Sequence, residues 1–342
     1  MTASPPRIER LPLAKALTAG LRAALEDDAR VMIMGEDVGI LGGVFRVTDG
    51  LLKDFGEDRV VDTPLAESGI LGTAIGLAMR GYRPVCEIQF DGFVFPAFNQ
   101  ITTQLAKIRY RSRGAVTVPL VIRIPYGGGI GAVEHHSESP EVYFAHTPGL
   151  RVVAPATPAD AFIMIQQAIA SPDPVVFLEP KRRYWDKADV DLAIRPETAS
   201  WGLHSSRIVR PGTDVTVVAH GAMVHTVLAA AAAAVEESTA DGTAGADIEV
   251  IDLRSLAPLD LDPVVASVRR TGRLVVAHEA PLPHGLGAEV AARIQEECFH
   301  LLEAPVIRVG GWATPYPPSR LESQYLPDAH RVLDAVDRAL AY

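Results

Sequence analysis

The sequence is poor in cysteine, aromatic residues and positive charge, and it has no long apolar run. Cys86 and Cys298 are the two cysteines among 342 residues, which is too few for a disulfide framework. We therefore expect a reducing compartment. The formal net charge of -10 argues against nucleic acid as a partner, because no basic stripe is available to neutralise phosphates. No run reaches membrane-spanning length and residues 1–10 hold no apolar signal core, so we expect a cytoplasmic protein without a membrane partner.

What is present describes a large, well-packed globular protein. Hydrophobic residues make up 48% of the chain and charged residues 22%. A chain of this length exceeds a comfortable single core, so two domains are expected. The surplus of apolar residues would fit a protein that buries part of its surface between subunits.

Short β-rich runs alternate with amphipathic helices along most of the chain, which is typical of an α/β fold with a parallel sheet covered on both faces. The expected strands are residues 31–34, 59–62, 83–88, 120–123, 151–153, 175–178, 215–219, 248–251 and 274–277. The expected helices are residues 13–26, 67–79, 93–110, 158–170, 223–237 and 328–340. The polar, aperiodic stretch 186–204 reads as a linker, which predicts domains over residues 1–185 and 205–342.

Glu67 opens a helix made almost wholly of small and apolar residues, just after a strand stopped by Pro64. An acid with no Lys or Arg nearby in the sequence, facing apolar surroundings, should resist ionisation and keep a proton for exchange. The alternative is that Glu67 only complements the positive end of the helix dipole. Taken alone, the residue favours the alternative.

The glycine-rich segment 126–132 follows a strand and contains Gly-x-Gly-x-x-Ala, but it lacks the helix and the later acid of a dinucleotide site. A closely approached loop is the better interpretation. His135 and His136 follow it, near Glu134, Glu138 and Glu141, yet adjacent histidines point apart and no complementary cluster stands elsewhere at ligand spacing. We therefore expect no metal site here. A histidine at the carboxyl end of a strand is a better acid-base candidate, although a surface residue without a role remains open.

Residues 87–98 place four phenylalanines behind a buried strand. Aromatic clusters usually belong to a core, and Phe90 or Phe93 beside Gly92 could instead form a flat wall against a ring.

Together these segments carry a resemblance. The chain resembles the beta subunit of the thiamine-diphosphate-dependent 2-oxoacid dehydrogenases, specifically the branched-chain type, within the transketolase-like superfamily. The resemblance covers nearly the whole chain and rests on residues 35–38, 42–46, 63–70, 87–98, 110–112, 136–141, 148–150 and 278–282. It implies a parallel-sheet pyrimidine-binding domain in residues 1–185 and a smaller α/β domain of the transketolase C-terminal type in residues 205–342.

The resemblance also implies roles for individual residues. Glu67 would hydrogen-bond the ring nitrogen of the cofactor's aminopyrimidine. Phe93 would stack on that ring, where branched-chain relatives carry tyrosine, and Gln89 and Leu65 fall on pocket positions. His136 would handle protons while the acyl group passes to a lipoyl arm.

The family binds the cofactor's diphosphate and Mg²⁺ through a Gly-Asp-Gly motif, which this chain lacks. The resemblance therefore implies an alpha subunit that supplies the Mg²⁺ site, in an assembly of two alpha and two beta chains, and a lipoyl acyltransferase as the next component. Some relatives hold potassium near residues 120–122, but Val121 stands where a threonine ligand is found. The alternatives are a pyruvate or acetoin dehydrogenase beta subunit, a non-catalytic assembly subunit, and a single-chain thiamine-diphosphate enzyme.

Overall fold

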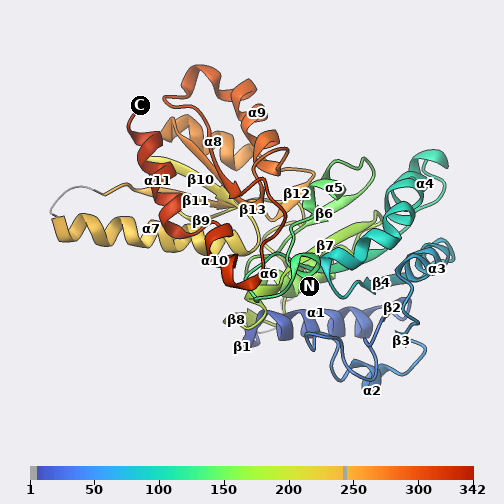
Figure 1. The fold of residues 1–342 in the computed structure, drawn as a ribbon. Helices are drawn as coiled ribbons and strands as arrows, with labels where there is room; N and C mark the ends of the chain where they lie inside the picture. The colour runs from blue at the N-terminus through green and yellow to red at the C-terminus, as the bar shows by residue number, and fades with distance from the viewer. Residues whose placement is uncertain (1–5, 242–244) are drawn as a thin grey trace. The chain divides into compact units, whose positions relative to one another are not determined.

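The computed structural model describes residues 6–241 and 245–342, coloured along the chain in Figure 1. It divides into two compact units. The first comprises Met1–Tyr126 and Tyr143–Leu203, and the second comprises Gly127–Val142 and His204–Tyr342. The short segment 127–142 therefore leaves the first unit and belongs to the second. Within the described residues, no helix combines the length and the apolar character that crossing a bilayer would need.

The first unit is built on parallel strands in the order β6-β7-β5-β4-β2-β3. The strands are β2 (Val31–Gly35), β3 (Val60–Asp62), β4 (Arg83–Glu87), β5 (Val121–Tyr126), β6 (Arg151–Val153) and β7 (Val175–Pro180). Strands β2, β5 and β7 are buried along their whole length, which explains why they read as continuous apolar runs rather than alternating ones. The α/β class expected from the sequence is confirmed.

Helices flank this sheet. They are α1 (Leu13–Asp27), α2 (Leu51–Phe55), α3 (Glu67–Met79), α4 (Ala106–Arg111), α6 (Pro158–Ala170) and the short turns η4 (Lys181–Arg183) and η5 (Pro196–Thr198), while α5 (Glu141–Ala145) begins in the second unit. Helix α1 packs along α6. At Gly20 a Cβ atom would lie 2.6 Å from the carbonyl oxygen of Phe162, so only glycine allows this close approach.

Two expectations from the sequence differ from the structure. The predicted helix 93–110 is a 3₁₀ segment, η1 (Asp91–Ala97), a π-helical segment, η2 (Gln100–Leu105), and then α4. Pro96 lies inside η1 and has no N–H to donate, which prevents a continuous α-helix. The predicted linker 186–204 contains strand β8 (Lys187–Asp191), which pairs antiparallel with β1 (Ile8–Pro12). This pairing satisfies the backbone N–H and C=O groups of both strands. The polar side chains of residues 187–191 gave no sign of it.

The second unit has strands in the order β14-β13-β10-β11-β9, parallel except for β9. The strands are β9 (Arg207–Arg210), β10 (Val215–Ala219), β11 (Ile248–Asp252), β13 (Leu274–Pro281) and β14 (Ile307–Gly311), with β12 (Ser255–Ala257) following β11. The helices are α7 (Ala222–Asp241), α8 (Asp262–Thr271), α9 (Leu286–Cys298), α10 (Glu322–Tyr325), α11 (Ala329–Leu340) and the short η3 (Glu134–His136), η6 (Phe299–Leu301) and η7 (Ser319–Leu321). Helix α11 packs beside α7, and α8 beside α9 (Figure 1).

A buried ion network joins three neighbouring strands of the first unit. Arg123 on β5 donates through Nη1 to Glu87 Oε2 on β4 at 2.6 Å, and through Nε and Nη2 to the carboxylate of Glu179 on β7 at 2.7 and 2.9 Å. Tyr184 donates its hydroxyl proton to the same Glu179 at 2.5 Å. Burial raises the pKa of Glu87, and the Arg123 guanidinium opposes that rise. Removing one partner of such a buried pair typically costs about 3–5 kcal/mol, because the other charge is left unpaired.

Another buried acid, Glu141, lies near the end of the segment 127–142. Glu141 is fully buried, and its Oε1 atom lies 3.7 Å from Nε2 of His220. Burial raises the pKa of Glu141 from 4.5 to about 8, and the neighbouring charge of Glu279 adds to the rise. Burial lowers the pKa of His220 to about 3, and His278 contributes to that drop. At neutral pH both Glu141 and His220 are therefore uncharged.

The Glu141→Gln substitution should flatten the dependence of stability on pH above pH 6.5. Between pH 4.5 and 8 the folded chain binds a proton at Glu141 that the unfolded chain does not. The free energy of unfolding should consequently fall as pH rises through this window, by about 1.4 kcal/mol per pH unit. His220 changes the dependence of stability on pH only below about pH 6.5, the ordinary pKa of histidine, because burial lowers its pKa in the folded protein. Glutamine has similar volume and no titrating proton, so this decline should disappear.

Thermal unfolding of the purified protein at intervals from pH 6.5 to 8 measures this effect. The Glu138→Gln substitution, at an exposed position three residues earlier, is the matched control and should keep the wild-type slope. Parallel curves for wild type and Glu141→Gln would contradict the expectation.

Candidate functional site

Three polar side chains follow three neighbouring parallel strands of the first unit. Glu36 comes directly after β2, Glu67 lies five residues after β3, and Gln89 lies two residues after β4. Since β4, β2 and β3 are adjacent and parallel, their carboxyl ends share one edge of the sheet. Ligands of α/β proteins bind at this edge.

Glu67 is the first residue of α3, and its side chain is buried, with 8% exposed. The helix directs Ile70, Leu71 and Ala74 inward, while its glycines lie on the exposed side. This pattern fixes the helix on the sheet and leaves the carboxyl group at the positive end of the helix dipole. The structure thus places Glu67 on a rigid element, as the sequence predicts.

Glu36 is a second acid at this edge, and no individual role was predicted for it. Its side chain is also 8% exposed. Burial raises the pKa of Glu36, and the negative charges of Glu67 and Asp37 raise it further. The negative charge of Glu67 thus acts directly on the Glu36 carboxyl group. The signal that could have revealed it is an acid two residues after the apolar run 31–34, at the end of the strand.

Gln89 is half-buried and reaches back to the loop after β2. Its amide nitrogen donates to Asp37 Oδ2 at 3.2 Å and to the carbonyl oxygen of Glu36 at 3.4 Å. Asp37 has a φ of 57°, in the left-handed region, which turns the chain sharply at the end of β2. Gln89 thus supports the turn that carries Glu36.

The loop after β2 is also anchored by β3. Asp62 accepts hydrogen bonds from the backbone nitrogens of Gly39 and Ile40 at 2.6 and 3.0 Å. Thr48 donates its hydroxyl proton to the carbonyl oxygen of Val38 at 2.7 Å. These contacts hold the loop at the carboxyl edge of the sheet.

An aromatic group forms one wall near this edge. Phe93 is half-buried in η1 and meets Phe90 edge to face, with ring centroids 5.9 Å apart. Phe90 contacts Phe45 at 5.5 Å, and Phe45 contacts Tyr184 of the buried ion network at 4.9 Å. Edge-to-face packing holds the rings in fixed orientations. Leu65, in contrast, is 81% exposed.

His136 lies in the second unit, in η3 of the segment 127–142. Its Nδ1 atom is 2.8 Å from the carbonyl oxygen of His135, and the two imidazole rings are 4.3 Å apart. The His136 side chain is half-buried, whereas His135 is exposed and lies 3.6 Å from Glu134. The contact with a carbonyl oxygen favours a proton on Nδ1 and leaves Nε2 as the acceptor.

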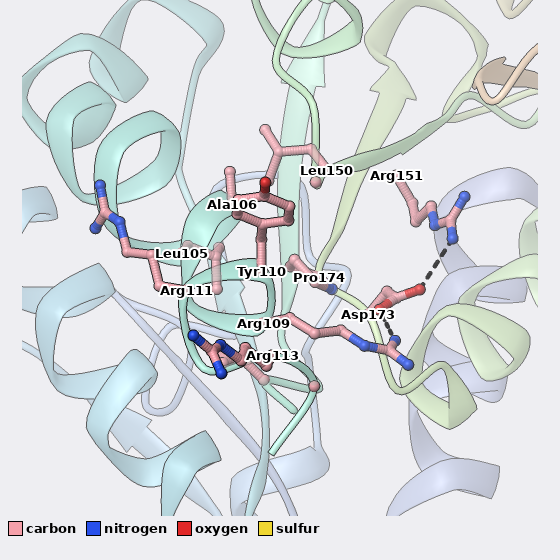
Figure 2. Close-up of a pocket in the computed structure, with 13 residues that line it drawn as sticks. Leu105, Ala106, Arg109, Tyr110, Arg111, Arg113, Leu150, Arg151, Asp173 and Pro174 are labelled. Carbon is pink, nitrogen blue, oxygen red and sulfur yellow. Dashed lines mark hydrogen bonds and ion pairs between the residues drawn. The ribbon is translucent and has the colours of Figure 1, made fainter. Parts of the chain in front are cut away.

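A cavity of about 870 Å³ in the first unit contains none of these residues (Figure 2). It is lined by α4, the turn after it and the ends of neighbouring strands, with four arginines at its walls. Arg109 and Arg151 both reach Asp173, the latter at 3.0 Å. Figure 2 shows that Arg111 and Arg113 point away from that pair, so the guanidinium groups do not converge on one point.

Two family models match the chain. The pyrimidine-binding domain of transketolase matches residues 9–186, and the C-terminal domain of transketolase matches residues 204–332. Together they span most of the sequence and agree with a parallel-sheet unit followed by a smaller α/β unit.

Proteins of known name are similar over the full length. A pyruvate dehydrogenase E1 component subunit beta from Leifsonia xyli subsp. xyli is 64% identical over 337 residues, covering 98% of this chain and 97% of that one. A 3-methyl-2-oxobutanoate dehydrogenase subunit beta from Mycobacterium tuberculosis is 54% identical over 332 residues, covering 97% and 92%. Among solved structures, a split-gene transketolase described as an inactive beta4 tetramer aligns with a TM-score of 0.77 and 24% identity, covering 97% and 99% of the two chains. That likeness shows the fold alone.

The site residues predicted from the sequence all lie within the pyrimidine-binding match. The sheet edge with Glu36, Glu67 and Gln89 lies within the pyrimidine-binding match, and so does the segment of His136. The chain belongs to the family of beta subunits of 2-oxoacid dehydrogenase E1 components, built from the transketolase pyrimidine-binding and C-terminal domains.

Proposed function

We propose that this chain, together with an alpha subunit, catalyses the oxidative decarboxylation of a 2-oxo acid and passes the acyl group to a lipoyl arm. The observation that carries the proposal is Glu67, a buried acid on the first turn of α3, coupled to a second buried acid, Glu36. A purely structural acid at a helix start would be expected at the surface, where water solvates it. Two carboxyl groups coupled in this way are typical of a site that exchanges protons.

The residues at the sheet edge fit the pyrimidine half of thiamine diphosphate. Glu67 offers a carboxyl group to a ring nitrogen, and Phe93 offers a flat face that Phe90 holds in place. Gln89 and the exposed Leu65 lie near the same strand ends and would line the pocket. When bound, the cofactor supplies the electron sink for the loss of carbon dioxide.

Glu67 would hold and return the proton at the pyrimidine ring nitrogen. Helix α3 fixes the orientation of this carboxyl group, and its burial strengthens any hydrogen bond that it makes. Glu36 would share the negative charge of the pair, because two close carboxyl groups do not easily ionise together. Phe93 has no hydroxyl group, so it can stack on a ring without a hydrogen bond to it.

His136 would serve the later transfer of the acyl group. Its Nε2 atom is left as an acceptor by the contact of Nδ1 with a carbonyl oxygen, which suits a group that takes up and returns a proton. The half-buried position in a surface segment leaves room for a long flexible arm to approach.

The chain is proposed to act with partners. An alpha subunit would complete the cofactor site, with its Mg²⁺ and diphosphate ligands, in an assembly of two alpha and two beta chains. A lipoyl acyltransferase would receive the acyl group. The lack of a Gly-Asp-Gly motif supports the need for an alpha subunit. We further propose a cytoplasmic location, with which the low cysteine content agrees.

For the substrate, we propose a branched-chain 2-oxo acid, as the motif resemblance implies. A second candidate is pyruvate, which the name of the 64% identical relative favours. Assaying the complex of alpha and beta subunits with both acids compares them directly. A higher kcat/KM for pyruvate than for 3-methyl-2-oxobutanoate would show that pyruvate is the preferred substrate.

The Glu67→Gln substitution should lower decarboxylation by about 10²- to 10⁴-fold in the complex with the alpha subunit, because an amide cannot deliver a proton to the ring nitrogen. Glutamine keeps the size of the side chain, so assembly should be unchanged. The measurement is carbon dioxide release, with size-exclusion chromatography as the check on assembly. Glu57→Gln, an exposed acid between α2 and β3, is the control. If Glu67→Gln kept near-normal turnover, Glu67 would only stabilise the positive end of the helix dipole, and the proposed proton transfer would be wrong.

His136→Ala should reduce overall acyl transfer more than decarboxylation measured with an artificial electron acceptor, because the acceptor replaces the lipoyl arm. We expect the ratio of the two rates to fall by about 10²-fold or more. His135→Ala is the neighbouring control, and it should leave the ratio unchanged. A silent His136→Ala combined with a severe loss in His135→Ala would show that the other histidine has this role.

A further inference from the structure

The segment that carries His136 begins with a glycine turn whose backbone N–H groups point at two acids. Gly127, Gly129 and Gly131 have φ angles of 81°, 93° and 70°, which only glycine adopts readily. This left-handed backbone turns successive N–H groups toward one side of the turn. The two acids come from distant parts of the same unit, at the end of β13 and the start of α10.

Glu322 accepts two hydrogen bonds from the glycine turn. Its Oε1 atom accepts a hydrogen bond from the nitrogen of Gly129 at 2.9 Å, and its Oε2 atom accepts one from the nitrogen of Gly131 at 3.0 Å. Glu279 adds a third point, because its Oε2 atom accepts from the nitrogen of Gly128 at 3.1 Å. Hydrogen bonds to a carboxylate are stronger than those between neutral groups.

The carboxylate of Glu322 is itself held in place. Tyr316 donates its hydroxyl proton to Oε1 at 2.7 Å, and its ring lies 4.8 Å from that of Tyr325. Tyr316, Tyr325 and Leu326 form a small buried cluster. A Cβ atom at position 128 would lie 1.9 Å from the Tyr316 hydroxyl oxygen, so the turn and the cluster fit without spare room.

The held turn lies just before His136. Gly131 is five residues before His136, and η3 begins at Glu134. On the other side of His136, the nitrogen of Gly127 donates to the carbonyl oxygen of Glu138 at 2.9 Å, which closes the segment on itself. A displacement at Gly129–Gly131 would therefore act on His136 from within the same short segment, whose two ends are joined at Gly127 and Glu138.

We propose that Glu322, supported by Tyr316 and Glu279, is a positioning residue for acyl transfer, which fixes the glycine turn and so the place of His136. The inference rests on the proposed role of His136. It adds that the C-terminal domain sets the geometry of a histidine in a segment that leaves the pyrimidine-binding unit. Glu322 does not touch the reacting atoms.

The test is Glu322→Ala in the complex with the alpha subunit. We expect the ratio of acyl transfer to decarboxylation with an artificial acceptor to fall by about 10- to 100-fold, because a small misplacement of a catalytic group costs that much. Glu322→Gln keeps one acceptor oxygen and should restore part of the ratio. Glu296→Ala, an exposed acid on α9, is the matched control. Equal losses in both rates would indicate a merely structural role and overturn the proposal.

A double-mutant cycle separates this inference from the proposed function. If Glu322 acts through His136, adding Glu322→Ala to His136→Ala should lower the ratio no further. Additive losses would overturn the positioning role. If His136→Ala alone leaves the ratio unchanged, the proposed function of His136 fails instead.

Hydrogen exchange gives a readout that does not depend on turnover. In Glu322→Ala, peptides covering residues 127–142 should exchange faster, whereas those covering α11 should keep the wild-type rate. If that variant does not fold, Tyr316→Phe replaces it, since it loses one hydrogen bond to Glu322 and keeps the ring. It should show the same changes to a smaller degree, and unchanged exchange in residues 127–142 would contradict the inference.

Discussion

The buried guanidinium of Arg123 is the constraint on which the pyrimidine-binding unit depends. It lies between carboxylates on the two strands beside its own, so it ties β4, β5 and β7 to one another. The Tyr184 hydroxyl group extends the network to the ring of Phe45, and Phe45 contacts Phe90. The orientation of the aromatic wall is thus tied to an ion network in the core. Removing either partner would leave a buried charge unpaired, so the three strands depend on the whole network.

The candidate site and its support place acids in three different surroundings. At the sheet edge, burial raises the pKa of Glu36, and the charge of Glu67 raises it further. At the end of the histidine segment, Glu141 is buried beside an uncharged imidazole and is itself uncharged at neutral pH. At the glycine turn, Glu322 accepts backbone hydrogen bonds. The surroundings of each acid, rather than the residue type, decide its pKa and its partners.

Much of the fold could be predicted from the sequence, because buried parallel strands such as 175–178 are continuous apolar runs bounded by turn residues. Helix α3 and the position of Glu67 at its start were predicted for the same reason. The sequence could not predict the broken helix after residue 91, since an aromatic and apolar pattern continues through Pro96. It also missed strand β8, because its polar side chains hide the pairing with β1. Glu36 and Glu322 were missed because their importance comes from partners far away in the sequence.

The separation along the chain between the glycine turn and Glu322 has a consequence for biosynthesis. The two hydrogen bonds join residues that are 193 and 191 positions apart. A ribosome makes the turn long before it makes Glu322, so the turn can gain these hydrogen bonds only after residue 322 has emerged. Contacts of such high sequence separation form late, after the local elements. A chain that stops before residue 322 would lack both of these hydrogen bonds to the glycine turn.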